Sequence, residues 1–400
     1  MNGSDPTDRC ARQAIVAGLA SLASAMGIGR FAFTPLWPLM QSETGLSLTQ
    51  GAGLASANYL GYLVGAVATF LLTVRASTAA RAGLIAVAAT TLAGAFVDSL
   101  AGWLVVRFAA GVASALVLIG ASAWTLRSLA HHQRMHWSGW AFAGVGVGIC
   151  LAGLMALLVA WIGVPTRWAW TSLGLLAAAV AAWTWRPLAS PEGDAPQTGS
   201  AVGGRLTGAG WVLIGCYGLF GFGYILPATF IPAAARAIVA SPIGFAWAWP
   251  LFGLAAAVST ALVSRLSGSG RPRRMAAASF IVMALGVLLV AIGSRLETLC
   301  IAAICVGGTF MVATMTCMQE ARRIARDAAD RLIAAMTAAF AVGQLLGPLT
   351  VGGSDSLRHA IAGPSMLAGA LLLLAGIALL VPHSASRAVP APVPDPGRCR

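Results

Sequence analysis

Long apolar stretches separated by short polar breaks run along almost the whole chain. Each stretch is close to the roughly 20 apolar residues that a helix needs to cross a bilayer core. In lipid the backbone polar groups must be satisfied within each segment, which favours helices, and the stretches are too long for the strands of a membrane barrel. The pattern therefore predicts an all-α polytopic membrane protein with twelve transmembrane helices, near 14–39, 51–73, 82–97, 102–126, 137–162, 168–185, 209–233, 244–264, 275–294, 298–319, 332–353 and 363–381.

The composition limits what else the chain contains. Of its 400 residues, 58% are hydrophobic and only 9% are charged, which excludes a set of soluble domains. Twelve helices of about 21 residues use roughly 250 positions and leave about 150 for loops and tails, too few for a soluble catalytic domain. We expect no enzyme, no cofactor and no metal site. The histidine cluster that suggests metal (His131, His132, His136) lies in a basic loop without a nearby acid or cysteine.

Arginine placement predicts how the chain is oriented. The chain has no lysine, and its 25 arginines and 12 acidic residues give a formal net charge of +13. Nineteen arginines fall in segments on one side of the predicted helices, and the opposite loops hold only Arg167, Arg236, Arg295 and Arg358. By the positive-inside rule, the arginine-rich side and both termini are cytoplasmic. The arginines form no contiguous patch with interleaved aromatic residues, so we expect no nucleic-acid partner.

The chain also contains an internal repeat. The first predicted helix ends with the segment 27–38 and the seventh with the segment 221–232; two glycines and a final proline match at an offset of 194 positions. The second predicted helix recurs at the same offset, near Phe245. Six helices separate the copies, so the repeat is parallel, about an axis along the membrane normal. We therefore predict five parts: a cytoplasmic N-terminal tail (1–13), a six-helix bundle (14–186), a cytoplasmic linker (187–208), a second six-helix bundle (209–381) and a disordered cytoplasmic tail (382–400).

Several motifs carry a resemblance to a known family. The segment Gly27–Met40 reads GIGRFAFTPLWPLM, the fourth predicted helix contains Arg107 with Gly111, and the fifth is rich in glycine. With the repeat, these features resemble the major facilitator superfamily, and the first segment resembles an uncharacterised bacterial branch of YbfB/YjiJ type. The loop after the second helix keeps only the arginines of the family's charged gating motif, and its counterpart in the second half (265–274) has no Asp.

The resemblance implies a transporter in the bacterial inner membrane. Two bundles would rock around a central cavity lined by the first, fourth, seventh and tenth helices, with the second, fifth, eighth and eleventh at the interface between the halves. Small residues four positions apart, which allow close helix approach, occur in all four of these interface helices. They are Gly61 and Gly65, Gly144 and Gly148, Gly253 and Ala257, and Gly343 and Gly347. The alternative is that such pairs arise from the abundance of glycine and alanine alone.

Two arginines lie within the predicted membrane helices. A guanidinium near the bilayer centre costs about 2.5 to 3.5 kcal/mol on insertion scales, so Arg30 and Arg107 need compensation or a function. Both lie on the outer side of the estimated helix centres, on two helices expected to line one water-accessible cavity. Polar and aromatic residues on the other helices are expected to line the same cavity: Asn58, Tyr62, Tyr217, Tyr224, Thr309 and Gln344.

These residues suggest that a small organic anion binds, with Arg30 as the principal partner of a carboxylate. The alternative for Arg30 is that it binds backbone carbonyls of a helix kinked at Pro35, and for Arg107 that it serves helix packing. We expect Asp98 to approach Arg107 as an ion pair, with a titrating switch as the alternative. Trp247 and Trp249 are expected in an interfacial aromatic belt.

The predicted function is secondary transport of a small organic solute by a monomer in the lipid bilayer. No acidic residue lies near the middle of a predicted helix, which argues against a cationic substrate. A uniporter, an anion exchanger with a counter-anion, and a symporter coupled to a proton all remain open. The rival is a non-transporting sensor or assembly protein of the same fold. Its main difficulty is that the longest connection, of roughly 20 residues, is short for a signalling module.

Overall fold

A computed structural model describes residues 6–71, 74–189, 206–239, 247–266, 272–325, 329–351 and 357–381. Within these ranges all regular structure is helical. The predicted tail 382–400 and most of the predicted linker lie outside the described residues, as do residues 1–5.

All twelve predicted membrane helices are present in the described part of the chain. In the first half they are α1 (Pro6–Leu22) continued by η1 (Ala23–Phe31) and α2 (Phe33–Thr44), then α3 (Leu48–Leu71), α4 (Ala76–Ala93), α5 (Leu100–His131), α6 (Ser138–Ile162) and α7 (Arg167–Thr184). In the second half they are α8 (Gly208–Ile238), α10 (Ala248–Leu266), α11 (Pro272–Ile292), α12 (Leu296–Ala325), α13 (Ala329–Leu349) and α14 (Leu357–Leu380). Two short 3₁₀ turns are also present: η2 (Met135–Trp137) precedes α6, and η3 (Pro187–Ala189) follows α7. Nine helical stretches of the described chain are long and apolar enough to cross a membrane, and the chain is a multi-pass membrane protein.

The first membrane helix differs from a regular α-helix in its middle. Between α1 and α2 the chain forms nine residues of π-helix, a wide form that is rare and frequent at functional sites. The alternative considered for Arg30 involves a kink at Pro35. In the structure α2 starts at Phe33, so Pro35 lies in its first turn, where the missing N–H is no loss. Gly27 lies in the π segment, against Gly148 of α6, where a Cβ would come within 2.1 Å of the Gly148 carbonyl carbon.

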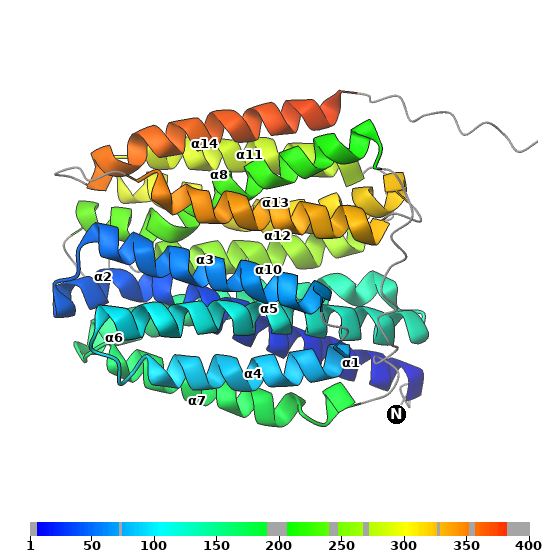
Figure 1. Cartoon of the computed structure of the whole chain (residues 1–400). Coiled ribbons are helices and arrows are strands. Elements are labelled where there is room, and N and C mark those ends of the chain that lie inside the picture. Colours follow the sequence, from blue (N-terminus) through cyan, green and yellow to red (C-terminus); the bar gives the residue numbers. More distant parts are fainter. Residues whose placement is uncertain are drawn as a thin grey trace, which may run out of the picture.

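The helices form two halves with matching internal packing (Figure 1). In the first half α4 packs on α5 and α7; in the second half α11 packs on α12 and α14 in the same way. Likewise α3 packs on α5, and α10 on α12. These pairs are related by the sequence repeat, which supports the prediction of two equivalent six-helix bundles.

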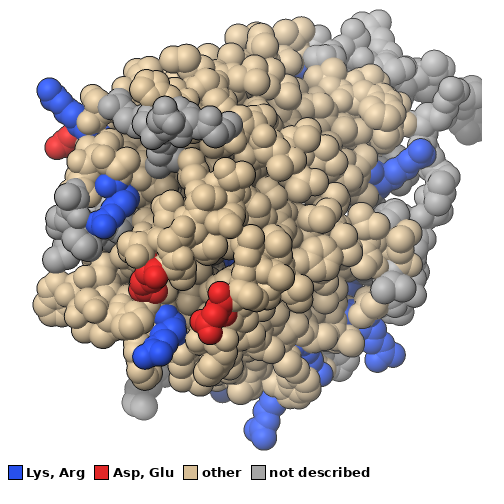
Figure 2. Space-filling view, turned by 60° about the vertical axis from the view of Figure 1, so that its left-hand side comes forward, with Lys and Arg blue, Asp and Glu red and all other residues tan. Residues whose placement is uncertain are grey.

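Both ends of the described chain lie at one end of the bundle, at the right in Figure 1. We call it the terminal end and the opposite one the far end. At the terminal end, an arginine near the start of the third helix of each half binds the end of the sixth helix. In the first half Arg81 donates to the Trp185 carbonyl (2.5 Å). In the second half Arg273 donates to the carbonyls of Leu379 and Val381 (both 2.5 Å). These arginines therefore fix helix ends within their own half. Figure 2 brings the far end forward; every acidic side chain visible there lies toward that end, whereas only basic ones mark the opposite edge.

The halves meet mainly through the second, fifth, eighth and eleventh membrane helices, as the family resemblance implies. Across this seam α6 packs on α10, α3 on α13, and the far-end segment α2 on α8. Close approach is greatest between α6 and α10, where a Cβ on Gly253 would lie 2.3 Å from the Cys150 nitrogen and one on Gly146 would lie 2.2 Å from the Ala257 nitrogen.

We expected the paired glycines to face across the seam. Gly253 does so, but the other paired glycines face helices of their own half. A Cβ on Gly61 or Gly65 would meet α5, one on Gly144 or Gly148 would meet the first membrane helix, and one on Gly343 or Gly347 would meet α8. All of these neighbours belong to the same half as the glycine. Spacing shows that a small face exists on a helix, but it does not show which neighbour fills that face.

Candidate functional site

Arg30 lies at the seam between the two halves, in the π segment η1. Its side chain is buried (2% exposed), facing neither solvent nor the outer surface of the bundle. Its Nη2 donates a hydrogen bond of 2.5 Å to Oε1 of Gln344 on α13, which belongs to the other half. The guanidinium also lies over the ring of Tyr62, 4.3 Å from its centroid. Arg30 therefore joins the halves through neutral partners.

Gln344 forms a hydrogen-bonded link between the two halves. Its amide oxygen accepts from Arg30, and its amide nitrogen donates to the hydroxyl of Tyr224 on α8. The side chain of Gln344 is fully buried (0% exposed). Tyr224 follows Arg30 by 194 positions, the offset of the repeat, so the two residues occupy equivalent places in the two halves. The structure thus brings together three of the residues that the sequence predicts for the site.

Arg107 on α5 has a different environment, entirely within the first half. Its guanidinium donates to the carbonyls of Gly29 (3.4 Å) and Arg30 (3.2 Å) and lies 4.6 Å from the centroid of the Phe33 ring. These carbonyls belong to the π segment, whose geometry departs from the regular helical bonding pattern. Arg107 therefore holds the backbone that carries Arg30, which favours the helix-packing alternative for this residue.

Asn58 supports the same arrangement from α3. Its amide nitrogen donates to the carbonyl of Arg107 (2.9 Å), so it fixes α5 rather than contacting Arg30. The expected ion pair between Asp98 and Arg107 is absent among the described residues: Asp98 is exposed, and Arg107 is bound by carbonyls instead. In the described part of the chain neither Arg30 nor Arg107 meets a carboxylate.

The expected water-accessible cavity is closed in this conformation, since Arg30 and Arg107 are only 2% and 3% exposed. Three buried polar atoms of the site nevertheless have no hydrogen-bond partner among the described residues: the Nε–H of Arg30, the Nε–H of Arg107 and Oδ1 of Asn58. An unpartnered buried polar group costs about 1 to 3 kcal/mol. The site therefore holds two positive groups with unused hydrogen-bonding capacity, and no acid among the described residues compensates them.

A second bridge between the halves is formed by Tyr59, which sequence reasoning missed. Its hydroxyl pairs with the hydroxyl of Thr229 on α8 at 2.9 Å, and the Arg30 guanidinium lies 5.3 Å from its ring centroid. Tyr59 lies three residues before Tyr62, on the same face of α3, and this spacing was the available signal. Tyr59 and Tyr62 together flank the guanidinium of Arg30.

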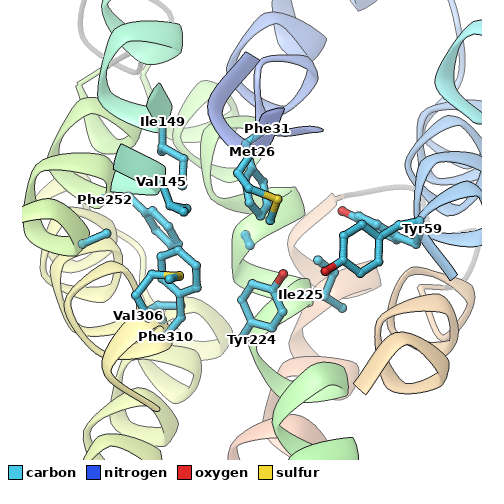
Figure 3. Close-up of a cluster of buried hydrophobic side chains, with 14 of the residues drawn as sticks. Met26, Phe31, Tyr59, Val145, Ile149, Tyr224, Ile225, Phe252, Val306 and Phe310 are labelled. Atoms are coloured by element: carbon cyan, nitrogen blue, oxygen red, sulfur yellow. The ribbon is translucent and has the colours of Figure 1, made fainter. Parts of the chain in front are cut away.

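The second half contributes an aromatic cluster to the site. Tyr224 stacks on Phe310 (5.8 Å, 3°) and on Phe340 (5.5 Å, 12°). Figure 3 shows Tyr224 between the Phe252 and Phe310 pair on one side and Tyr59 on the other, with Met26 and Phe31 of the first half facing them. Tyr217 lies two turns away on α8 and packs on Phe340 (5.0 Å), so it belongs to this cluster without contacting Arg30.

Two expectations about side-chain placement need correction. The Thr309 hydroxyl donates to the Cys305 carbonyl of its own helix (2.6 Å), and its neighbour Phe310, not Thr309, faces Tyr224. Trp249 is fully buried (0% exposed), with its ring 6.3 Å from Phe31 across the seam, and so is no part of an interfacial belt. Trp247, by contrast, is 48% exposed. Both tryptophans lie near a helix end, which suggested an interfacial aromatic belt, but Trp249 faces inward.

Comparisons with known proteins agree with this architecture. The model of the family described as "Uncharacterised MFS-type transporter YbfB" matches residues 22–380. No curated protein matches the chain in sequence. Among solved structures, the human organic anion transporter MFSD10 (TETRAN) superposes with a TM-score of 0.65 at 14% sequence identity, covering 94% of this chain and 100% of that chain. At this identity the likeness shows a shared fold.

Proposed function

The chain belongs to the family of uncharacterised MFS-type transporters of YbfB type, and we propose that it carries a small organic anion across the membrane by alternating access. Its major facilitator fold and its family place it among transporters rather than enzymes. The environment of Arg30 carries the anion proposal. Its guanidinium is buried at the seam, donates to a neutral amide and has an Nε–H without a partner among the described residues.

Charge balance supports an anionic rather than a cationic substrate. Two arginines lie close together in the interior, because Arg107 donates to the backbone carbonyl of Arg30, and no carboxylate among the described residues offsets them. Guanidinium groups bind carboxylates and phosphates through paired, charge-assisted hydrogen bonds. An incoming anion gains these bonds, whereas a cation would meet repulsion at the same place.

Gln344 supports a specific exchange when the anion binds. Its amide oxygen accepts a hydrogen bond from one donor of Arg30, as a carboxylate oxygen would. We propose that the anion displaces this oxygen and becomes the bridge between the halves. Arg107 acts as a positioning residue, since it holds the π segment that presents Arg30.

We propose that opening toward each end of the bundle breaks a different set of contacts at the seam. Opening toward the far end separates α2 from α8 and breaks the pair formed by Tyr59 and Thr229. Opening toward the terminal end separates the start of α6 from the end of α10, where Gly139 lies against Ser264. Each opening exposes Arg30 to one side of the membrane in turn, which is the requirement for alternating access.

The remaining parts of the proposal rest on sequence. We propose that the arginine-rich terminal end, where both ends of the described chain lie, faces the cytoplasm, and that the protein is a monomer in a bacterial inner membrane. A coupling proton or a counter-anion supplies the driving force. The structural neighbour is described as an organic anion transporter, which agrees with the substrate class proposed for this chain.

The test uses purified full-length protein and carboxylates paired with their neutral amides. We expect ligand-dependent thermal stabilisation by at least one monocarboxylate and none by the matching amide. Substitution of Arg30 by Gln is expected to abolish it, whereas the same substitution at the exposed Arg12 on α1 leaves it unchanged. Failure of a broad carboxylate panel would favour the rival, a sensor or assembly protein with this fold.

A further inference from the structure

Aromatic side chains form a continuous arc at the level of Arg30. Starting from Phe31, whose ring lies 5.3 Å from the Arg30 guanidinium carbon, the arc crosses the seam to Trp249 at 6.3 Å. It continues to Phe252 (4.8 Å), Phe310 (5.6 Å) and Tyr224 (5.8 Å). Tyr224 returns to Arg30 through Gln344, so the contacts close into a ring.

This closed ring of contacts joins the two halves at only two places. Arg30 and Phe31 belong to the first half, and every other member belongs to the second. The two joints are the hydrogen bond from Arg30 to Gln344 and the packing of Phe31 on Trp249. When the halves rock apart, both joints open together, while the aromatic members of the second half keep their mutual stacking. An entering molecule therefore meets a guanidinium on one side and flat aromatic faces on the other.

Trp249 has an unused hydrogen-bond donor in this ring. Its side chain is fully buried (0% exposed), and its indole N–H has no partner among the described residues. Buried indole N–H groups normally find an acceptor, because an unpaired buried donor destabilises the protein. The donor lies on the residue that forms the aromatic joint across the seam. An acceptor supplied by a ligand at this joint would satisfy it.

We propose that the substrate is an aromatic carboxylate whose ring carries a hydrogen-bond acceptor, and that Trp249 selects for it. This rests on the proposed function, since the carboxylate end is the partner of Arg30. The ring of the substrate stacks against the arc, and its acceptor takes the indole N–H of Trp249. Trp249 is thus a specificity-determining residue, linked to Arg30 through Phe31.

Stacking favours an aromatic ring over a saturated ring of similar size. The arc presents paired faces, with interplanar angles of 18° between Trp249 and Phe252 and 3° between Tyr224 and Phe310. Aromatic pairs contribute about 0.5 to 1.5 kcal/mol beyond the burial of area, or roughly a two- to ten-fold preference. A hydrogen bond to the indole N–H contributes a similar, separate preference.

The experiment measures binding to the full-length protein by calorimetry with three kinds of probe. Benzoate against cyclohexanecarboxylate tests the ring, and 3- and 4-acetylbenzoate against 3- and 4-isopropylbenzoate test the acceptor at matched shape. Benzoate is expected to bind roughly two- to ten-fold more tightly than cyclohexanecarboxylate. One acetylbenzoate is expected to bind about ten-fold more tightly than its isopropyl partner.

Variants at two neighbouring tryptophans assign the second preference. Trp249→Phe keeps a ring and removes the N–H, and it is expected to abolish the preference for acetyl over isopropyl while keeping that for benzoate. Trp247→Phe, at a half-exposed position two residues away, is the matched control and is expected to change neither. The wild-type comparisons stand by themselves if Trp249→Phe fails to fold.

The outcomes separate this inference from the function on which it rests. If carboxylates bind through Arg30 but cyclohexanecarboxylate matches benzoate, the aromatic class is wrong and the anion proposal stands. If Trp249→Phe keeps the acetyl preference, Trp249 is not the selecting residue. If no carboxylate binds, both proposals are wrong.

Discussion

Arg30 and Tyr224 occupy equivalent positions of the two repeats and meet at the amide group of Gln344. Arg30 donates to its oxygen, and its nitrogen donates to the Tyr224 hydroxyl. The two halves thus diverge at this position: one supplies a permanent positive charge, and the other supplies an aromatic hydroxyl. A cation therefore faces aromatic rings at the place where the halves meet.

The first prediction concerns the charge of Arg30. Arg30→Gln removes the charge-assisted hydrogen bonds to an anion, each worth about 1.5 to 3 kcal/mol, so benzoate affinity is expected to fall roughly 10- to 100-fold. Arg30→Lys keeps the charge but loses the fork geometry, and we expect an intermediate affinity. Calorimetry on purified protein measures both. Arg12→Gln, which removes an exposed charge, is the control, and equal affinities in all variants would contradict the assignment.

The second prediction concerns Gln344 as the hydrogen-bond acceptor of Arg30. Gln344→Glu places a carboxylate beside the guanidinium, which stabilises its ionised form and forms an internal ion pair. Benzoate affinity is expected to fall at least about ten-fold, because the anion must displace a charged competitor. Gln344→Ala removes the competitor and is expected to retain or raise the affinity. Tight benzoate binding by the Glu variant would show that Gln344 does not share the site of the anion.

The third prediction concerns the packing of the π segment. Gly27→Ala places a Cβ 2.1 Å from the backbone of Gly148, and the resulting overpacking is expected to destabilise the fold by about 1 to 3 kcal/mol or more. Gly53→Ala on α3 is the control, because a Cβ there meets nothing within 4 Å. Melting temperatures in detergent distinguish the two variants. Equal melting temperatures would mean that η1 and α6 are not in close contact.

The fourth prediction concerns the seam between α6 and α10. Gly253→Ala is expected to push these helices apart, since its Cβ would lie 2.3 Å from the Cys150 nitrogen. In a background without native cysteines, a cysteine introduced at the buried Ser264 reports the separation by its rate of maleimide labelling. The rate is expected to rise with Gly253→Ala and to stay constant with Gly215→Ala, where a Cβ has open space. An unchanged rate in both would place the seam elsewhere.

The fifth prediction concerns the arginine that holds the end of α14. Arg273→Ala removes donors to the carbonyls of Leu379 and Val381, so the last turn of the helix is expected to fray. Amide exchange over 377–381 should accelerate about ten-fold or more, since each such bond contributes about 1.5 to 3 kcal/mol. Arg274→Ala, next along the chain and exposed, is the control. Equal exchange in both variants would exclude a capping role.

Hydropathy predicted the twelve membrane helices, and the resemblance to a known family predicted which of them meet between the halves. Both are long-range averages over many residues, and single side chains alter them little. The fine placement of side chains was harder to predict. The partners of Gly61 and Gly343 depend on helix rotation, which periodicity leaves undetermined. The π segment around Arg30 arises from backbone bonding that hydropathy does not encode.

The candidate site was predicted in part, and the errors have identifiable causes. Arg30, Tyr62, Tyr224 and Gln344 come together because polar residues in apolar helices face the interior. Trp249 was misplaced because tryptophan near a helix end is common at the bilayer surface, and only the tertiary packing shows that it faces inward. The other aromatic residues of the site carry no polar signal that sets them apart from core residues.

The central claim, that Arg30 binds a transported organic anion, is tested most directly by counterflow in proteoliposomes. Vesicles containing the wild-type protein are loaded with benzoate, 4-acetylbenzoate or an aliphatic monocarboxylate and diluted into the labelled form of the same solute. The account predicts transient accumulation of at least one carboxylate with wild-type and Arg12→Gln protein, none with Arg30→Gln, and none for the matching amide. Accumulation that persists in Arg30→Gln protein, or that is equal for the carboxylate and its amide, would contradict it.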